Sequence, residues 1–394
     1  MKPLVVKKKI TSRSYDEFCL PLRDILRSTP VLKSRGDRPL QMTFEHQLNA
    51  LIWFHLQEHD SARHLVSDLN GNDFAKEFIA PDGGISRSSF SEAINNRGLE
   101  QLQYVFNELS KQARATLPAD FQALGELVAI DGSLIDTVLS MHWADYRKKS
   151  KKAKGHFGFD INRGIPTGFH LTKGKAGERP FVDQILSAGQ TGVMDRGYHS
   201  HILFDSLQKS GKNFVCRIKA CTVKDLVEEY PVQQGGPVFY DASVHLGSGR
   251  SRTTLPVRVV GYKIDGTKYY VATNRFDLTA EQIAEVYKLR WNIETFFGWW
   301  KQHLHVYHLI ARSRYGLTVQ MLGGLITYLL MAMYCRKHFN QNVSVGNIRR
   351  IRMKIQNELM ASQKVDWYHH NIPVEETVCK KLTGHYWVTI GYFR

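Results

Sequence analysis

The pattern of apolar and polar positions divides the chain near residue 126. Before that point apolar residues recur every three or four positions, as from Phe44 to Leu69, where the spacing predicts a helix. Ser86 follows the turn sequence PDGG and is expected to cap another helix. That helix is rich in hydroxyl, amide and guanidinium groups, which suit a DNA-reading module as well as a plain solvated helix. Its exposed side is expected to carry Arg87, Ser88, Ser91, Asn95, Asn96 and Arg97.

Residues 126–219 predict an α/β core with the element order βββαβαβ. The strands are short β-branched or alternating runs, and the Arg163-Gly164 pair marks a turn between the second and third of them. The first helix opens at Pro180, which is favoured at a first helical position. Strands are expected at 127–130, 156–162, 166–172, 193–195 and 213–219, and helices at 181–189 and 201–211.

A second strand-rich segment, residues 220–275, interrupts this core. It alternates like strands, and Asp265-Gly266 predicts a tight hairpin, so an all-β insertion is expected. A long helical pattern follows over about 279–304. The predicted regions are therefore a helical DNA-binding region (1–125), the core (126–219 and 276–316), the insertion (220–275) and a C-terminal helical region (317–394).

Neither a membrane nor a disulfide framework is expected. The apolar run from Met321 to Cys335 is shorter than the roughly 18 residues of a membrane span, so it predicts a buried helix. The N-terminus has no apolar stretch typical of a secretory signal, so a cytoplasmic protein is expected. Because no CxxC pair is present, a cysteine zinc site is not expected either. The five cysteines are scattered, at Cys19, Cys216, Cys221, Cys335 and Cys379.

The charge balance indicates a polyanionic partner. Lysine and arginine number 53 against 37 aspartate and glutamate residues, which gives a net charge of +16. The glycine-rich TKGKAGERP sequence (172–180) lacks the GK[ST] ending of a phosphate-binding loop, so no nucleotide cofactor is expected. A basic run is expected to contact the DNA backbone, namely Arg147, Lys148, Lys149, Lys151, Lys152 and Lys154.

Three acidic residues lie where the predicted elements would present them at one edge of a sheet. Asp131 and Asp195 each end a short apolar strand, where side chains escape burial. Asp136 and Asp160 are the alternatives if Asp131 is not the first functional carboxylate. Glu294, the third, lies on the long helix after the insertion.

The helix that carries Glu294 has a polar stripe beside its apolar face. With Tyr287 as origin and about 100° per residue, Arg290 falls near 300°, Glu294 near 340° and Lys301 near 320°. The apolar residues occupy roughly 180° to 280° on the same wheel. A solvated face would lie opposite the apolar arc, so this arrangement favours a functional site.

These residues resemble the three catalytic motifs of the DDE transposases. The Tyr-Arg-Glu-Lys spacing resembles that of the insertion-sequence-four family of bacterial mobile elements, over roughly residues 126–310. Each motif is short, but their order and their placement at predicted strand ends make the combination specific. The motifs are IDGS (130–133), DRGY (195–198) and Y-x2-R-x3-E-x6-K from Tyr287 through Arg290 and Glu294 to Lys301.

The resemblance implies a ribonuclease-H-like core and a metal-dependent reaction. Asp131, Asp195 and Glu294 would hold two magnesium ions, with manganese able to substitute, about 4 Å apart. Family members act as homodimers that cut double-stranded DNA at the ends of the element, form and reopen a hairpin, and join the 3′ ends to target DNA. The resemblance further implies phosphate contacts from Tyr287, Arg290 and Lys301, and support of Asp195 by Arg196 and Tyr198.

Two basic residues are expected near the DNA, and one aromatic residue typical of the family is absent. Lys154 and His156, at the start of the second predicted strand, are expected near the scissile phosphate. In well-studied family members a tryptophan in the insertion stacks on a flipped base, whereas residues 220–275 contain none. The aromatic residues that would replace it are left open among Phe239, Tyr240, Tyr262, Tyr269 and Tyr270.

Two other functions are compatible with parts of the pattern. A nuclease with the same core would cut DNA without joining it. An inactive, transposase-derived repressor would bind DNA without metal, but it would have no need to gather three carboxylates beside phosphates that they repel.

Overall fold

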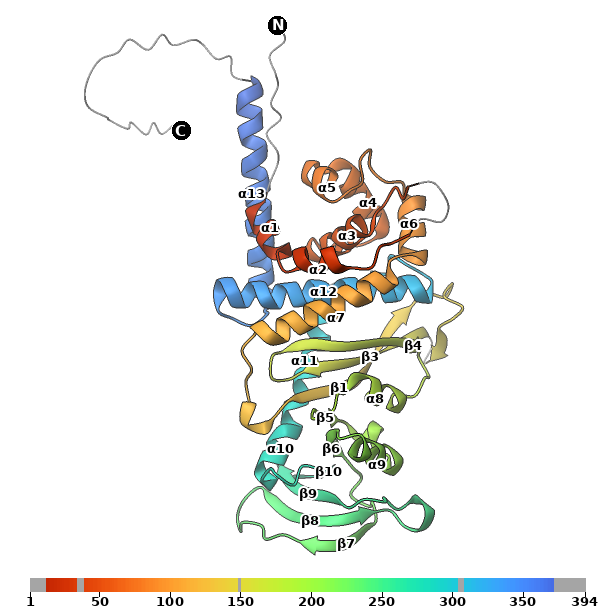
Figure 1. Cartoon of the computed structure of the whole chain (residues 1–394), viewed down its shortest axis with the longest axis vertical. Coiled ribbons are helices and arrows are strands. Elements are labelled where there is room, and N and C mark those ends of the chain that lie inside the picture. The colour runs from red at the N-terminus through yellow and green to blue at the C-terminus, as the bar shows by residue number, and fades with distance from the viewer. Residues whose placement is uncertain (1–11, 34–38, 148–149, 304–307, 372–394) are drawn as a thin grey trace, which may run out of the picture.

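The computed structural model describes residues 12–33, 39–147, 150–303 and 308–371, and Figure 1 shows how their helices and strands are arranged. The predicted single helix from Phe44 to Leu69 is wrong, because the chain turns after Leu56 and Ser61 caps a new helix by accepting from His64 N–H. The predicted cap at Ser86 is confirmed. The helices that precede the sheet are α1 (Arg13–Cys19), α2 (Leu22–Ser28), α3 (Phe44–Leu56), α4 (Ala62–Gly71), α5 (Asp73–Phe78), α6 (Arg87–Asn96) and α7 (Leu99–Thr116), followed by the 3-10 turn η1 (Gln122–Leu124).

The described strands form one ten-stranded sheet, whose first part has the predicted order of elements with one short strand added. From one edge the order is β2-β3-β1-β5-β6-β10-β9-β8-β7, and β4 also pairs with β3. β1 is antiparallel to β3 and parallel to β5, which is parallel to β6. The core elements are β1 (Leu127–Thr137), β2 (Asp145–Arg147), β3 (Ser150–Asp160), β4 (Ile165–Lys173), η2 (Arg179–Phe181), α8 (Val182–Ile185), β5 (Thr191–Met194), η3 (Arg196–Tyr198), α9 (His201–Lys209) and β6 (Asn213–Arg217).

The strand-rich segment 220–275 continues this sheet. Its last strand pairs antiparallel with β6, so the segment extends the core at the lower end of Figure 1. The predicted hairpin is confirmed: Asp265 and Gly266 have φ values of 46° and 76°, as a tight turn between antiparallel strands requires. The elements are β7 (Lys224–Glu229), β8 (Val238–Leu246), η4 (Gly249–Ser251), β9 (Val257–Ile264) and β10 (Thr267–Thr273).

Alternation along the strands creates two apolar layers, one on each face of the sheet. Val128 and Ile130 of β1 belong to a cluster that includes residues of α8 and α9. Leu127 and Ala129 belong instead to the larger cluster that includes residues of α10 and α11. Figure 1 shows these two pairs of helices on opposite sides of the strands. We call the two sides the α8/α9 face and the α10/α11 face.

The predicted long helix after the insertion is two helices, α10 (Ala280–Leu289) and α11 (Trp291–His303). The α-helical hydrogen bonding is interrupted at Arg290, whose amide bonds to the carbonyl of Tyr287 three residues earlier. Ile283 and Val286 of α10 and Phe296 of α11 nevertheless join the same apolar layer.

The predicted buried apolar helix is confirmed. It is α12 (Arg314–Phe339), and 89% of its most apolar window is buried beneath α3, α6, α7 and β4. It is the one helix in the described ranges that is long and apolar enough to cross a membrane, and its burial identifies it as a core helix. The last helix, α13 (Val345–Asn371), contacts α1 and extends away from the body (Figure 1). The cysteines at 19, 216, 221 and 335 are free thiols, and Cys379 lies outside the described residues.

Candidate active site

The first two predicted carboxylates come together because their strands are parallel neighbours. Ile130 of β1 and Met194 of β5 are register partners, and Asp131 and Asp195 follow them directly. Asp131 does not end its strand as predicted, since β1 continues to Thr137. It lies instead where the pairing of β1 with β5 ends.

Both carboxylates leave the sheet on the side of the third. Alternation places Asp131 with Ala129 and Asp195 with Val193, and both apolar residues belong to the α10/α11 layer. Asp131 accepts a 2.7 Å hydrogen bond from Gly132 N–H. Asp195 accepts a 2.8 Å bond from Gly197 N–H and thereby caps η3.

Arg290 joins the third carboxylate to the first. Its Nη2 lies 2.6 Å from Glu294 Oε1, and its Nη1 lies 3.7 Å from Asp131 Oδ2. The side chain of Arg290 is 13% exposed, so these contacts are only weakly screened by water. The break between α10 and α11 places Arg290 at the corner from which it reaches both acids.

The pKa of Asp131 is raised by its burial and by neighbouring carboxylates. Burial raises its pKa from the ordinary 3.8 to about 7, and the charges of Asp195 and Glu178 act in the same direction. The Gly132 N–H and the guanidinium of Arg290 oppose the rise without cancelling it. A carboxyl in this state is stabilised as an anion by any additional cation that enters the site.

The carboxylates are ligands of the type that a hard divalent cation prefers, but Arg290 lies between two of them. Carboxylate oxygens are the ligands that magnesium and manganese prefer. Within the described ranges no three His, Cys, Asp or Glu side chains lie close enough to enclose a metal ion. Arg290 separates Asp131 from Glu294 and already supplies the positive charge between them. The residue types therefore suit a divalent cation, whereas their arrangement in this structure is that of two carboxylates bridged by Arg290.

The other members of the Tyr-Arg-Glu-Lys stripe lie nearby. The Tyr287 ring centre is 5.8 Å from Arg290 Cζ, and the Tyr287 side chain is largely buried. Lys301 Nζ lies 6.0 Å from the ring centre of Phe297, and burial lowers the pKa of this lysine.

The two DRGY residues predicted to support Asp195 differ in exposure. Arg196 is exposed, whereas Tyr198 is fully buried within the α8/α9 layer. Tyr198 therefore contributes packing beneath the site.

Lys154 and His156 lie on the wrong side of the sheet for the predicted phosphate contact. They pair across β1 with Leu134 and Gly132, which point away from the face of Asp131. His156 is 0% exposed, hydrogen-bonds Thr172 and stacks on Phe181. Lys154 is buried and pairs with Glu178. The sequence could not reveal this, because a one-residue change of register exchanges the two faces.

The two alternative carboxylates are engaged elsewhere. Asp160 is 1% exposed and pairs with Arg163 at 3.1 Å and with Arg114 at 3.3 Å. Asp136 pairs with Lys152 in β3. In the predicted basic run, Lys151, Lys152 and Lys154 are strand residues, and Lys148 and Lys149 lie outside the described residues.

The predicted DNA-reading face of α6 is smaller than expected. Asn95 accepts a 2.7 Å hydrogen bond from Ser313 at the start of α12, and Arg97 pairs with Glu92 at 2.6 Å. Asn95 therefore joins α6 to α12, and Arg97 is paired within its own segment. The exposed remainder comprises Arg87, Ser88, Ser91 and Asn96.

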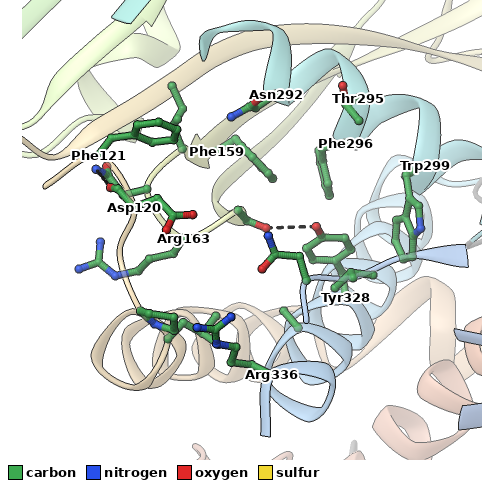
Figure 2. A pocket seen from close by; sticks show the side chains of 18 residues that line it. Asp120, Phe121, Phe159, Arg163, Asn292, Thr295, Phe296, Trp299, Tyr328 and Arg336 are labelled. Atoms are coloured by element: carbon green, nitrogen blue, oxygen red, sulfur yellow. Dashed lines mark hydrogen bonds between the residues drawn. The ribbon is translucent and has the colours of Figure 1, made fainter. Parts of the chain in front are cut away.

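A separate cavity lies on the far side of α11 from Glu294. It has a volume of ≈ 340 Å³ and is lined by aromatic side chains that include Phe121, Phe159 and Trp299. Figure 2 shows Arg163 and Arg336 at its rim and the hydrogen bond from Tyr328 to the carbonyl of Gly164, 3.1 Å long. None of the three predicted carboxylates lines it. This cavity is therefore distinct from the carboxylate site.

Comparison with known families agrees with the geometry. Residues 122–330, more than half of the chain, match the transposase DDE domain family. A Geobacillus stearothermophilus protein named as a transposase for insertion sequence element IS5377 is 28% identical over 234 residues, 57% of this chain and 60% of that protein. A Sinorhizobium fredii protein named as transposase y4zB is 27% identical over 201 residues, 49% of this chain and 56% of that protein.

Two further similarities are more distant. A Synechocystis protein named as a transposase for insertion sequence element IS4SA is 23% identical over 256 residues, 62% of this chain and 70% of that protein. A cryo-EM structure of the piggyBac transposase synaptic complex with hairpin DNA has a TM-score of 0.42 and 9% identity, covering 93% of this chain and 81% of that chain. The aligned stretch spans less than two thirds of the first two sequence relatives.

The raised pKa of Asp131 predicts a characteristic loss of stability with pH. Because the folded-state pKa of about 7 exceeds the ordinary 3.8, the folded protein binds a proton that the unfolded chain has released. Binding of this proton stabilises the folded state, so the free energy of unfolding falls by up to roughly 4 kcal/mol as pH rises from about 4 to 7. Thermal unfolding of the metal-free wild type and of Asp131→Asn should show a stability difference that falls over this range and is flat above it. A pH-independent difference would contradict the assignment.

The position of Arg290 predicts competition with a metal ion. Without DNA, Arg290→Gln should bind Mn²⁺ about tenfold more tightly, equivalent to roughly 1.4 kcal/mol, because a competing cation has been removed. Electron paramagnetic resonance of free Mn²⁺ measures this affinity. Arg252→Gln is the control, since Arg252 pairs with Asp225 at the far end of the sheet. Weaker binding in Arg290→Gln would show that this residue supports the ion instead.

Proposed function

Because this chain belongs to the DDE transposase family, we propose that it binds the ends of a mobile DNA element, cuts them by metal-dependent phosphodiester chemistry and joins the 3′ ends to target DNA. The observation that carries the proposal is that Asp131 and Asp195 follow register partners on adjacent parallel strands, and that Arg290 joins Asp131 to Glu294 on the same face of the sheet. A DNA partner agrees with the net charge of +16. The proposal includes a homodimer that holds two element ends.

The order of the strands supports a ribonuclease-H-like core. β4, β3 and β1 are antiparallel neighbours, and β1, β5 and β6 are parallel neighbours. In the proposal this five-stranded part is the catalytic core, and β7 to β10 enlarge it on the side of β6.

The proposed chemistry divides between bound ions and the residues of the chain. Asp131, Asp195 and Glu294 would hold magnesium or manganese, which activates the attacking hydroxyl and stabilises the leaving oxygen. Arg290, Tyr287 and Lys301 are proposed to contact phosphates near the cut. Their charges and hydrogen-bond donors would offset the repulsion between the carboxylates and DNA.

Loss of the third carboxylate should abolish cutting. Glu294→Gln removes the charge at nearly constant shape, and losing several kcal/mol of metal-assisted stabilisation slows cleavage by about 10³-fold or more. A denaturing gel on labelled DNA that spans the sequences flanking the gene measures this, with and without magnesium. The control is Glu285→Gln, because Glu285 is exposed on α10. Equal cutting by Glu294→Gln would contradict the proposed site.

Among the aromatic residues of the insertion, Tyr269 is best placed to stack on a flipped base. It lies on the α10/α11 face, and Arg217 Cζ is 4.6 Å from its ring centre. Its ring stacks at 5.6 Å on Tyr262, which is 1% exposed and therefore inaccessible itself. Tyr270 points to the other face, where it packs with Phe239 and Tyr240.

This placement predicts a selective defect in hairpin formation. Tyr269→Ala should leave the first nick intact but lower the hairpin product roughly tenfold or more, because stacking on one base contributes about 1–3 kcal/mol. The ratio of hairpin to nicked DNA on a denaturing gel is the measurement. Tyr270→Ala is the matched control from the opposite face. An unchanged ratio in Tyr269→Ala would remove this residue from the hairpin step.

The same gels distinguish the other two functions. Metal-dependent cutting without any joined product would favour a nuclease. Binding with no cutting by wild type or Glu294→Gln would favour an inactive repressor.

A further inference from the structure

A segment that the proposed function does not use packs against the back of both catalytic strands. It is the turn between β4 and α8, whose sequence lacks the ending of a phosphate-binding loop. Glu178 and Arg179 lie within it. No spacing in the sequence connects these residues to Asp131 or Asp195, because the contacts form only in the folded sheet.

Glu178 covers the residue that follows Asp131. A Cβ atom built on Gly132 would lie 2.7 Å from Glu178 Oε1, so the carboxylate occupies the space that a side chain would need. Gly132 lies on the α8/α9 face, with Ile130 and opposite His156. Glu178 therefore presses on the peptide that carries Asp131 from the side of the sheet opposite to the Asp131 carboxylate.

Lys154 holds Glu178 in this position. Its Nζ donates to Glu178 Oε1 at 2.8 Å and to the carbonyl of Ala176 at 3.1 Å. The Lys154 side chain is 10% exposed and that of Glu178 is 26% exposed, so this ion pair is less screened than a surface pair. Because Lys154 belongs to β3, the pair fixes the turn to the strand beside β1.

Arg179 contacts the glycine whose amide bonds to the second carboxylate. Its Nε and Nη2 donate to the carbonyl of Gly197 at 3.2 and 3.1 Å. The amide of Gly197 in turn donates to Asp195. Two consecutive residues of one turn thus contact the glycines that orient Asp131 and Asp195.

We propose that Glu178 is a positioning residue that fixes the Asp131-Gly132 peptide from the back of the sheet through its ion pair with Lys154. Glu178 is not a metal ligand in this proposal, because it lies on the other face. The inference rests on the proposed DNA cleavage for its kinetic consequence. A displacement of about 1 Å at a reacting group can cost roughly 10²-fold in rate, so rigid support behind Asp131 has a measurable effect.

The kinetic test compares Glu178→Gln, Lys154→Met and the double variant. Each should lower the cleavage rate at saturating DNA by about tenfold to 10²-fold and leave the DNA dissociation constant within twofold of wild type. The double variant should lose no more than either single one, because all three lack the same ion pair. Asp183→Asn is the control, since it breaks the Lys212–Asp183 pair on the neighbouring α8. It should leave the rate unchanged.

Three results would overturn the proposal. They are a Glu178→Gln rate within twofold of wild type, losses that multiply in the double variant, and weaker DNA binding with an unchanged rate. The last would instead make Lys154 a DNA contact.

Amide hydrogen exchange tests the same idea without cleavage. In folded Glu178→Gln, the Gly132 amide should exchange roughly tenfold faster than in wild type, because its bond to Asp131 is no longer supported. The Gly197 amide should change little, since Arg179 remains. Unchanged exchange at the Gly132 amide would overturn the proposed positioning role of Glu178. If wild type cuts no DNA, the proposed function fails, and the exchange result still decides the role of Glu178.

Discussion

The shared contact of Arg290 with Asp131 and Glu294 is the interaction on which the site depends. Three elements that are distant in sequence bring negative charge to one face of a sheet, and that arrangement is unfavourable without a cation. Arg290 supplies the cation from the corner between α10 and α11. Arg290 lies between the two helices and keeps helical dihedral angles, so it forms an i,i+4 pair with Glu294 while its other guanidinium nitrogen reaches Asp131 on β1.

The apolar layers decide which side of the sheet becomes the site. On β1, Leu127, Ala129 and Ile135 pack toward α10 and α11, and Asp131 interrupts that apolar series on the same face. Asp195 follows Val193 on that face. Both carboxylates are partly exposed, although buried residues precede each of them. The opposite face remains packed, with Tyr198 and His156 buried within it.

Much of this was accessible from the sequence because it depends on local pattern. The apolar strand stretch before each aspartate, the Asp265-Gly266 hairpin and the order of strands and helices are all encoded within a few residues of each position, whereas the continuation of β1 to Thr137 was not predicted. The stripe of Tyr287, Arg290 and Glu294 could be recognised by spacing alone. That spacing survives the helix break because the turn at Arg290 replaces only one step of the helical ladder.

The features that could not be predicted depend on register and on long-range contact. Lys154 and His156 were expected beside the scissile phosphate, but the pairing of Gly132 with His156 turns both away from Asp131. The charge of Lys154 is then satisfied by Glu178, 24 residues later in the chain.

The front and the back of the sheet therefore carry different ion pairs that converge on the same peptide. Arg290 contacts Asp131 through its carboxylate, and Glu178 contacts the following glycine from behind. The front contact joins the partly exposed Asp131 to Arg290. In the proposed reaction a metal ion would compete for Asp131, and DNA phosphate would compete for Arg290. The back contact joins β3 to a turn on the α8/α9 face, away from the Asp131 carboxylate. A site that must exchange its cations during a reaction can keep its geometry only if the support behind it does not depend on those cations, and the Lys154–Glu178 pair meets that condition.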